Sequence, residues 1–113
     1  MRFHASHIST SIAGDYSQVM FKAERDSGAS DRPYLLLQPQ FETPGGGECY
    51  IETHDEAYRG HFRLCRIEFT PVKLSIELDR PTNNVIDVTF DITIADFRQA
   101  SRVVKTIRPS KIP

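Results

Sequence analysis

The stretch Tyr34-Leu35-Leu36-Leu37 is the only place in the chain where four consecutive residues are all large and apolar. Neighbouring side chains of a β-strand point to opposite faces, so a strand that is apolar at every position needs both faces covered. Pro33 precedes the run and Pro39 follows it, and proline belongs at strand ends because it cannot donate to a ladder. We therefore expect an inner strand of the core here. A buried helix is the alternative, because so short a run has no readable period.

Two further strands are expected before this run. Residues 1–8 mix apolar residues with histidines and read as a weak or edge strand. Residues 16–24 alternate clearly between apolar and polar, apart from Met20, which adds an apolar group to the polar side. They predict a half-buried strand. Residues 25–32 are rich in Ser, Gly and Asp and predict a loop.

A glycine-rich segment follows the apolar run Tyr34–Leu37. Residues 39–47 contain three consecutive glycines but lack the Gly-Lys-Ser/Thr and helix of a phosphate loop, so they predict a turn. Residues 48–53 then alternate again. They predict a strand that presents Glu48, Tyr50 and Glu52 on one face.

The second half of the chain is more regular. Residues 62–69 predict a strand whose apolar phase slips between Leu64 and Cys65, as a bulge or a strand apolar on both faces would produce. Residues 72–78 and 85–92 alternate strictly and predict two further antiparallel strands. The positions expected to face the core are Val72, Leu74, Ile76, Leu78, Ile86, Val88, Phe90 and Ile92.

At Thr93 the apolar period changes from two to about three and a half, which predicts a helix. Thr93 and Asp96 resemble a capping box, and the carboxylate suits the helix dipole. Pro109 is expected to end the helix, and residues 109–113 read as a frayed tail. The stripe expected to face the core consists of Phe97, Ala100, Val104 and Ile107.

Together these elements predict an α+β fold: a curved antiparallel sheet of about six or seven strands with one C-terminal helix packed on one face. At 113 residues, the chain is long enough for a single core and too short for two, so we expect one domain over residues 1–113. The strand pattern is weakest over residues 1–33.

The overall charge argues against two classes of partner. Lys and Arg number 14 against 15 Asp and Glu, so no excess of positive charge favours nucleic acid or an anionic membrane. No apolar run approaches the roughly 20 residues of a membrane span. The amino terminus also lacks a charged-then-apolar signal pattern. We expect a cytoplasmic protein.

Patterns for metal binding and catalysis are missing from the sequence. His4 and His7 would point to opposite faces of a strand. His54 and His61 flank a polar loop, and the spacing between them matches no zinc-binding motif. The serines lack a nucleophile elbow. We expect no enzyme activity, no metal and no cofactor.

The two cysteines predict reduced, packed thiols. Cys49 and Cys65 lie in separate predicted strands, have no C-x-x-C spacing and lack the helix-start setting of a reactive thiol. A disulfide between them stays open, because neighbouring strands would allow it.

The acidic segment 42–60 is the remaining candidate for function. The segment contains several carboxylates and only one Lys or Arg residue, Arg59. Two tyrosines lie among the carboxylates. Acidic groups steer a basic partner, and tyrosines supply rigid contact area with a hydrogen-bonding tip. A solvated strand face and loop is the alternative. The candidate partner-binding residues are Glu48, Tyr50, Glu52, Asp55, Glu56 and Tyr58.

The order of motifs carries a resemblance. The motifs are Tyr34-Leu35-Leu36-Leu37-Gln38, a Gly-containing turn, Tyr50-Ile51-Glu52, a loop ending in Tyr58-Arg59-Gly60, strands over 64–69, 72–78 and 85–92, and a helix beginning near Phe97. This order resembles the immunity protein 10 family of bacterial polymorphic toxin systems, over residues 34–107. Pro39 departs from it, because a basic residue is expected after the glutamine. The resemblance implies a protein that neutralises a cognate toxin in the cytoplasm without catalysis.

We therefore expect a small immunity protein that occludes the active site of a toxin in a one-to-one complex. Two other functions stay open. One is a small-molecule-binding or hydrolytic domain with a pocket between sheet and helix, lined by His54, His61 and carboxylates. The other is a homodimer built by edge pairing of residues 2–8.

Overall fold

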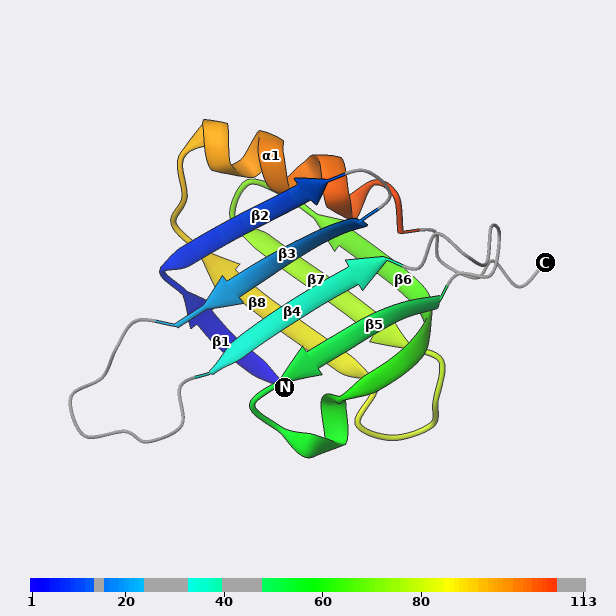
Figure 1. Ribbon diagram of the computed structural model, residues 1–113. Helices are drawn as coiled ribbons and strands as arrows, with labels where there is room; N and C mark the ends of the chain where they lie inside the picture. The colour runs from blue at the N-terminus through cyan, green and yellow to red at the C-terminus, as the bar shows by residue number, and fades with distance from the viewer. Residues whose placement is uncertain (14–15, 24–32, 40–47, 108–113) are drawn as a thin grey trace.

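The computed structural model describes residues 1–13, 16–23, 33–39 and 48–107. It shows an α+β fold, in which an eight-stranded, mostly antiparallel sheet carries one C-terminal helix (Figure 1). The order across the sheet is β1-β8-β7-β6-β5-β4-β3-β2, with β1 parallel to β8 and every other pair antiparallel. The elements are β1 (Arg2–Ala5), β2 (His7–Ala13), β3 (Tyr16–Lys22), β4 (Tyr34–Pro39), β5 (Glu48–Thr53), the short 3-10 helix η1 (Glu56–Tyr58), β6 (Gly60–Phe69), β7 (Lys73–Leu78), β8 (Val85–Phe90) and α1 (Ile94–Val104).

The first thirteen residues join the two ends of this sheet. β1 pairs with β8 and β2 pairs with β3, and only Ser6, whose amide donates to the Lys22 carbonyl at 2.9 Å, separates them. The sheet therefore curls into two layers, with β2 to β5 in front and β6 to β8 crossing behind them (Figure 1). This segment forms two strands instead of one, so the sheet has eight strands rather than the six or seven that were expected. Pairing of residues 2–8 with a second copy stays a prediction.

β6 belongs to both layers because it contains a register shift. Its first part pairs with β5 and its second part with β7, and the register shifts between Leu64 and Arg66. Such a shift lets a strand bend and leaves Cys65 as the extra residue. The phase slip expected at this position is thus confirmed as a bulge.

The hydrophobic core lies between the two layers. Phe21 of β3 stacks on Phe90 of β8, with 5.8 Å between ring centres, and contacts Phe69 of β6 at 6.3 Å. The helix α1 packs against β2 and β3, and its Phe97 stacks on Phe69 at 4.8 Å. Strands from opposite layers and the helix therefore meet at one aromatic cluster.

The apolar run Tyr34–Leu37 lies in an inner strand of the sheet, as expected. β4 lies between β3 and β5, and Leu35 and Leu37 face the core with no exposed surface. Leu36 lies on the opposite face yet is only 9% exposed, between Met20 and Glu52 in the strand register. Both faces of the run are therefore covered, but only one of them by the core.

The helix begins as predicted and ends earlier. Oγ1 of Thr93 accepts a hydrogen bond from the Asp96 amide at 3.1 Å, which confirms the cap. The helix ends at Val104 rather than near Pro109, and Ile107 is buried just beyond it. The predicted tail 109–113 lies outside the described residues, as do residues 25–32 and 40–47.

Two expectations for the third quarter of the chain were wrong. Val72 is 65% exposed, because β7 begins only at Lys73 after the turn in which the Thr70 amide bonds the Lys73 carbonyl. Ser75, one of the polar residues that alternate with the core positions of this strand and were expected to face water, is 5% exposed. Its hydroxyl donates to Asp87 at 2.7 Å.

Cys49 and Cys65 are both free thiols, so the disulfide that the sequence left open is not present.

Within the described ranges, no helix is long and apolar enough to cross a membrane.

Candidate binding face

The outward side chains of β2 to β5 and the start of β6 form one surface, which we call the outer face. Strand pairing places these side chains in rows: Lys22 lies opposite His7 and Tyr34, and Glu52 lies opposite Leu36. This is the front layer of Figure 1. The outer face consists of His7, Ser9, Ser11, Gln18, Met20, Lys22, Tyr34, Leu36, Gln38, Glu48, Tyr50, Glu52, His61 and Arg63.

At the centre of the outer face, two tyrosines hold one carboxylate. The hydroxyl of Tyr34 donates to Oε2 of Glu52 at 3.1 Å, and the hydroxyl of Tyr50 donates to Oε1 at 2.9 Å. The two rings come from neighbouring strands and reach Glu52 from β4 and from its own strand β5. Each oxygen of a carboxylate has two lone-pair sites. Glu52 is therefore fixed in place and still able to accept further hydrogen bonds.

The same hydrogen bonds keep both phenols protonated. Burial and the hydrogen bond to Glu52 raise the pKa of Tyr34, and the hydrogen bond to Glu52 followed by burial raises the pKa of Tyr50. The positive charge of Arg59 opposes both shifts in part; its Nε donates to the Thr53 carbonyl at 2.7 Å. Both tyrosines thus stay hydrogen-bond donors to the carboxylate at neutral pH.

The candidate histidines lie apart from one another. His61 packs against Tyr50, with 5.3 Å between ring centres. Nδ1 of His54 accepts from the Tyr34 amide at 3.2 Å, and its ring contacts Phe3 at 6.0 Å. Across the described part of the chain, no three His, Cys, Asp or Glu side chains are grouped as metal ligands would be.

A depression between β2 and α1 is the place where the alternative function expected a pocket. Its volume is about 190 Å³. The residues around it are Thr10, Ile12, Gln99 and Arg102, and neither histidine nor carboxylate is among them. The lining expected for a hydrolytic pocket is therefore not what the structure brings together there.

Three of the six predicted contact residues share the outer face. Glu48, Tyr50 and Glu52 all point outward from β5. Asp55 instead caps η1, where its Oδ1 accepts from the Ala57 amide at 3.0 Å. Glu56 is exposed on η1, at the end of the strand.

Tyr58, the last of the six residues predicted to contact a partner, does not lie on the outer face. The residue is only 6% exposed and belongs to the core. Its hydroxyl accepts from the amino group of Met1 at 3.3 Å, and the guanidinium of Arg80 covers its ring. A tyrosine enclosed on the ring and at the hydroxyl is not free to meet a partner.

The sequence did not point to a second feature of the outer face, a depression beside Tyr34. Its volume is about 400 Å³. It is lined by His7, Met20, Lys22, Ala23, Pro33, Tyr34 and Glu52. These residues come from four strands or their ends, so no local sequence pattern predicts that they line one depression. The one signal was Met20, an apolar residue on the polar side of its strand.

The outer face is also less acidic than the segment 42–60 suggested. Arg63 lies opposite Glu48, and His61 lies opposite Tyr50. Among the described residues, neither Glu48 nor Glu52 takes part in an ion pair. Glu48 therefore has the positive charge of Arg63 on the neighbouring strand without being paired to it.

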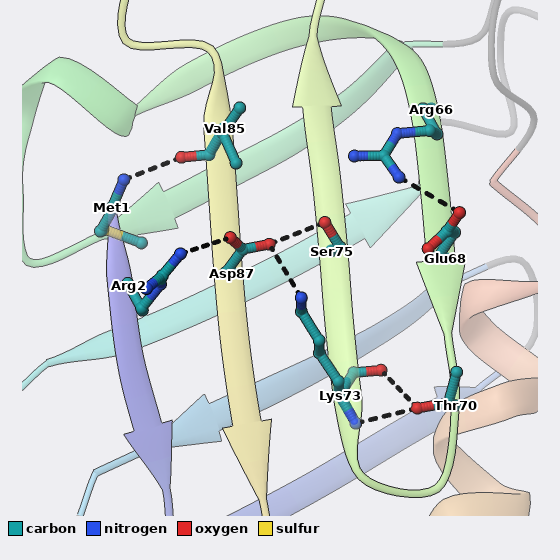
Figure 2. A network of polar contacts seen from close by, with 9 residues as sticks. All are labelled: Met1, Arg2, Arg66, Glu68, Thr70, Lys73, Ser75, Val85 and Asp87. Atoms are coloured by element: carbon teal, nitrogen blue, oxygen red, sulfur yellow. Dashed lines mark hydrogen bonds and ion pairs between the residues drawn. The ribbon is translucent and has the colours of Figure 1, made fainter.

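The opposite side of the molecule shows a different use of charge. Figure 2 shows Asp87 of β8 accepting from the Ser75 hydroxyl at 2.7 Å and lying 3.6 Å from Arg2 and 4.0 Å from Lys73. The hydrogen bond from Ser75, aided by Lys73 and Arg2, lowers the pKa of Asp87 against the opposing effect of burial. Two positive side chains therefore lie beside the carboxylate of Asp87, whereas Glu52 has no ion pair among the described residues.

Comparison with known proteins gives no relative: no family model matches the chain, and no curated protein or solved structure does either.

Proposed function

We propose that the protein is an immunity protein, which binds a cognate bacterial toxin and occludes its active site. The observation that carries the proposal is the carboxylate of Glu52, held between Tyr34 and Tyr50 on an exposed sheet face. The order of motifs over residues 34–107, which resembles the immunity protein 10 family, supports the same function.

The outer face has the physical properties that an inhibitor needs. Its side chains stand on paired strands, so little conformational freedom is lost when a partner binds. Tyrosines are frequent among the residues that dominate binding energy. A standard interface buries about 800 Å² on each partner, which a sheet face of this extent can supply.

The carboxylates fit a basic partner in particular. Glu48 and Glu52 point outward from β5, and Glu56 is exposed on η1 just beyond it. Active sites that bind phosphates are lined by positive charge, which attracts carboxylates and speeds association. A nuclease-like cleft is therefore the kind of active site that this row of carboxylates would cover.

The thiols favour binding over cysteine-based catalysis. Burial raises the pKa of Cys49 to about 12. Burial and the nearby Asp79 raise the pKa of Cys65 as well. The thiolate is the nucleophile in cysteine chemistry. Neither residue therefore supplies one at neutral pH.

Co-expression tests the proposal. If the gene directly upstream encodes a large secreted protein, its variable carboxyl-terminal domain is the toxin to use. Expression of that domain alone should stop growth, and co-expression of this protein should restore it. The variant that combines Glu52→Lys and Glu56→Lys should protect less, because it reverses charge on the binding side.

The matched control combines Glu68→Lys and Asp91→Lys. Both side chains are exposed, 63% and 96%, and lie away from the outer face. This variant should protect as well as the wild type. Absence of protection by the wild type would refute the function, whereas equal protection by both double variants would refute only the assigned face.

A further inference from the structure

The depression beside Tyr34 separates opposite charges. Lys22 stands on one side of it, next to His7 on the neighbouring strand, and Glu52 stands on the other. Met20, Ala23 and Pro33 contribute apolar groups to the lining. Lys22 makes no ion pair with any other described residue. The site thus has a positive group on β3, a negative group on β5 and apolar groups among its lining residues.

Strand order extends this arrangement across the whole outer face. The charged residues are Lys22 on β3, then Glu48 and Glu52 on β5, then Arg63 on β6, while β4 contributes only neutral side chains outward. A basic cleft that covers the carboxylates of β5 would meet repulsion at Lys22 and Arg63 unless acidic side chains border the cleft. A partner with alternating charges fits in one orientation only, because complementary charges fix the register of an interface.

The depression is open rather than enclosed. None of its seven lining residues is buried, and His7 and Lys22 are exposed. Small-molecule sites usually bury about 70–90% of the ligand surface. A volume of about 400 Å³ on an open face instead suits a side chain that projects from a larger surface, which then covers the rest of the site.

We propose that this depression is the anchor site that sets the orientation of the toxin. It receives an apolar side chain of the toxin, flanked on one side by a carboxylate that pairs with Lys22 and on the other by a hydrogen-bond donor to Glu52. The inference rests on the proposed immunity function and adds which part of the outer face holds the partner and what chemistry the partner brings.

Binding measurements between the purified protein and the same toxin domain test it. Ala23→Trp adds a large side chain at the lining of the depression and should raise the dissociation constant at least about a hundredfold, the loss of affinity expected of a central anchor. Ala95→Trp is the control, because Ala95 is exposed on α1. It should change the constant less than about twofold. Circular dichroism establishes that both variants are folded.

Charge reversal provides the second measurement. Lys22→Glu should weaken binding about tenfold at low salt and less at high salt, because salt screens exposed charges. Lys105→Glu, exposed at the end of α1, is its control. If Ala23→Trp does not fold, the result for Lys22→Glu decides.

The outcomes separate the two proposals. Tight binding by the wild type together with unchanged binding by Ala23→Trp and Lys22→Glu would overturn the anchor site and leave the immunity function standing. No binding by the wild type would overturn both. Weaker binding of the toxin domain by Ala23→Trp and Lys22→Glu, but not by Ala95→Trp and Lys105→Glu, supports the anchor site.

Discussion

The guanidinium of Arg80 lies over the ring of Tyr58, 5.2 Å from its centre. The same group lies 4.9 Å from the centre of the Phe62 ring and donates to the Ala57 carbonyl at 2.7 Å. Arg80 follows β7 and therefore ties the connection between β7 and β8 to η1 and β6. Tyr58 is enclosed for this reason, although it stands in a polar stretch of sequence.

Arg80→Met should lower the free energy of unfolding by about 1–3 kcal/mol, because it removes two cation–π contacts and the hydrogen bonds to carbonyls. Arg80→Lys should restore only part of this, since an ammonium lacks the planar fork. Urea denaturation measures both. Arg98→Met, on the exposed side of α1, is the control. Equal stability of Arg80→Met and Arg98→Met would contradict a stabilising role for Arg80.

Asp87→Asn should lower the free energy of unfolding by about 1.5–3 kcal/mol at neutral pH, the usual contribution of hydrogen bonds to a charged group. The pKa of Asp87 is depressed from its ordinary 3.8, so its stabilising effect is complete above that value. The effect is lost as the pH falls through the folded-state pKa below 3.8. Unfolding curves of wild type and variant should converge under acid; a constant difference would exclude the carboxylate as its source.

The strands were predictable wherever one face is buried. Leu74, Ile76 and Leu78 alternate with polar residues because β7 has the core on one side only, and the periodicity of two follows. The register shift in β6 was readable for the same reason, since an extra residue reverses the phase. Residues 1–13 were harder, because β1 pairs with β8, which lies far along the chain, and no local pattern encodes that partner. β2 instead forms a hairpin with β3, which follows it directly.

The outer face was predictable only in part. Alternation in β5 placed Glu48, Tyr50 and Glu52 together, because residues two apart share a face. Tyr34 and Lys22 join them through strand pairing alone, which a single sequence does not specify. The run containing Leu36 was read as core on both sides, whereas Leu36 lies on the outer face, where it is covered between Met20 and Glu52.

Leu37→Ala should destabilise the protein by about 2–5 kcal/mol, because a fully buried side chain leaves a cavity. Leu36→Ala should cost less, since its neighbours on the outer face, Met20 and Glu52, border solvent and can close over the gap. Thermal unfolding of the two variants gives the comparison. If the two leucines cost the same, the outer face is packed as tightly as the core.

Glu52→Gln should lower the pKa values of Tyr34 and Tyr50 toward the ordinary 10.0, because the charge that helps to hold their protons is removed. Alkaline titration followed by tyrosinate absorbance measures this, and Tyr34→Phe and Tyr50→Phe assign the two transitions. For a phenol whose folded-state pKa is raised, stability is complete below pH 10 and falls as the pH rises further.

The wild type should therefore lose stability more steeply above pH 10 than Glu52→Gln does. Identical titrations of the two proteins would mean that the tyrosines do not hold this carboxylate in solution. Glu52 would then be a mobile surface group, and the main structural support for the binding face would be gone.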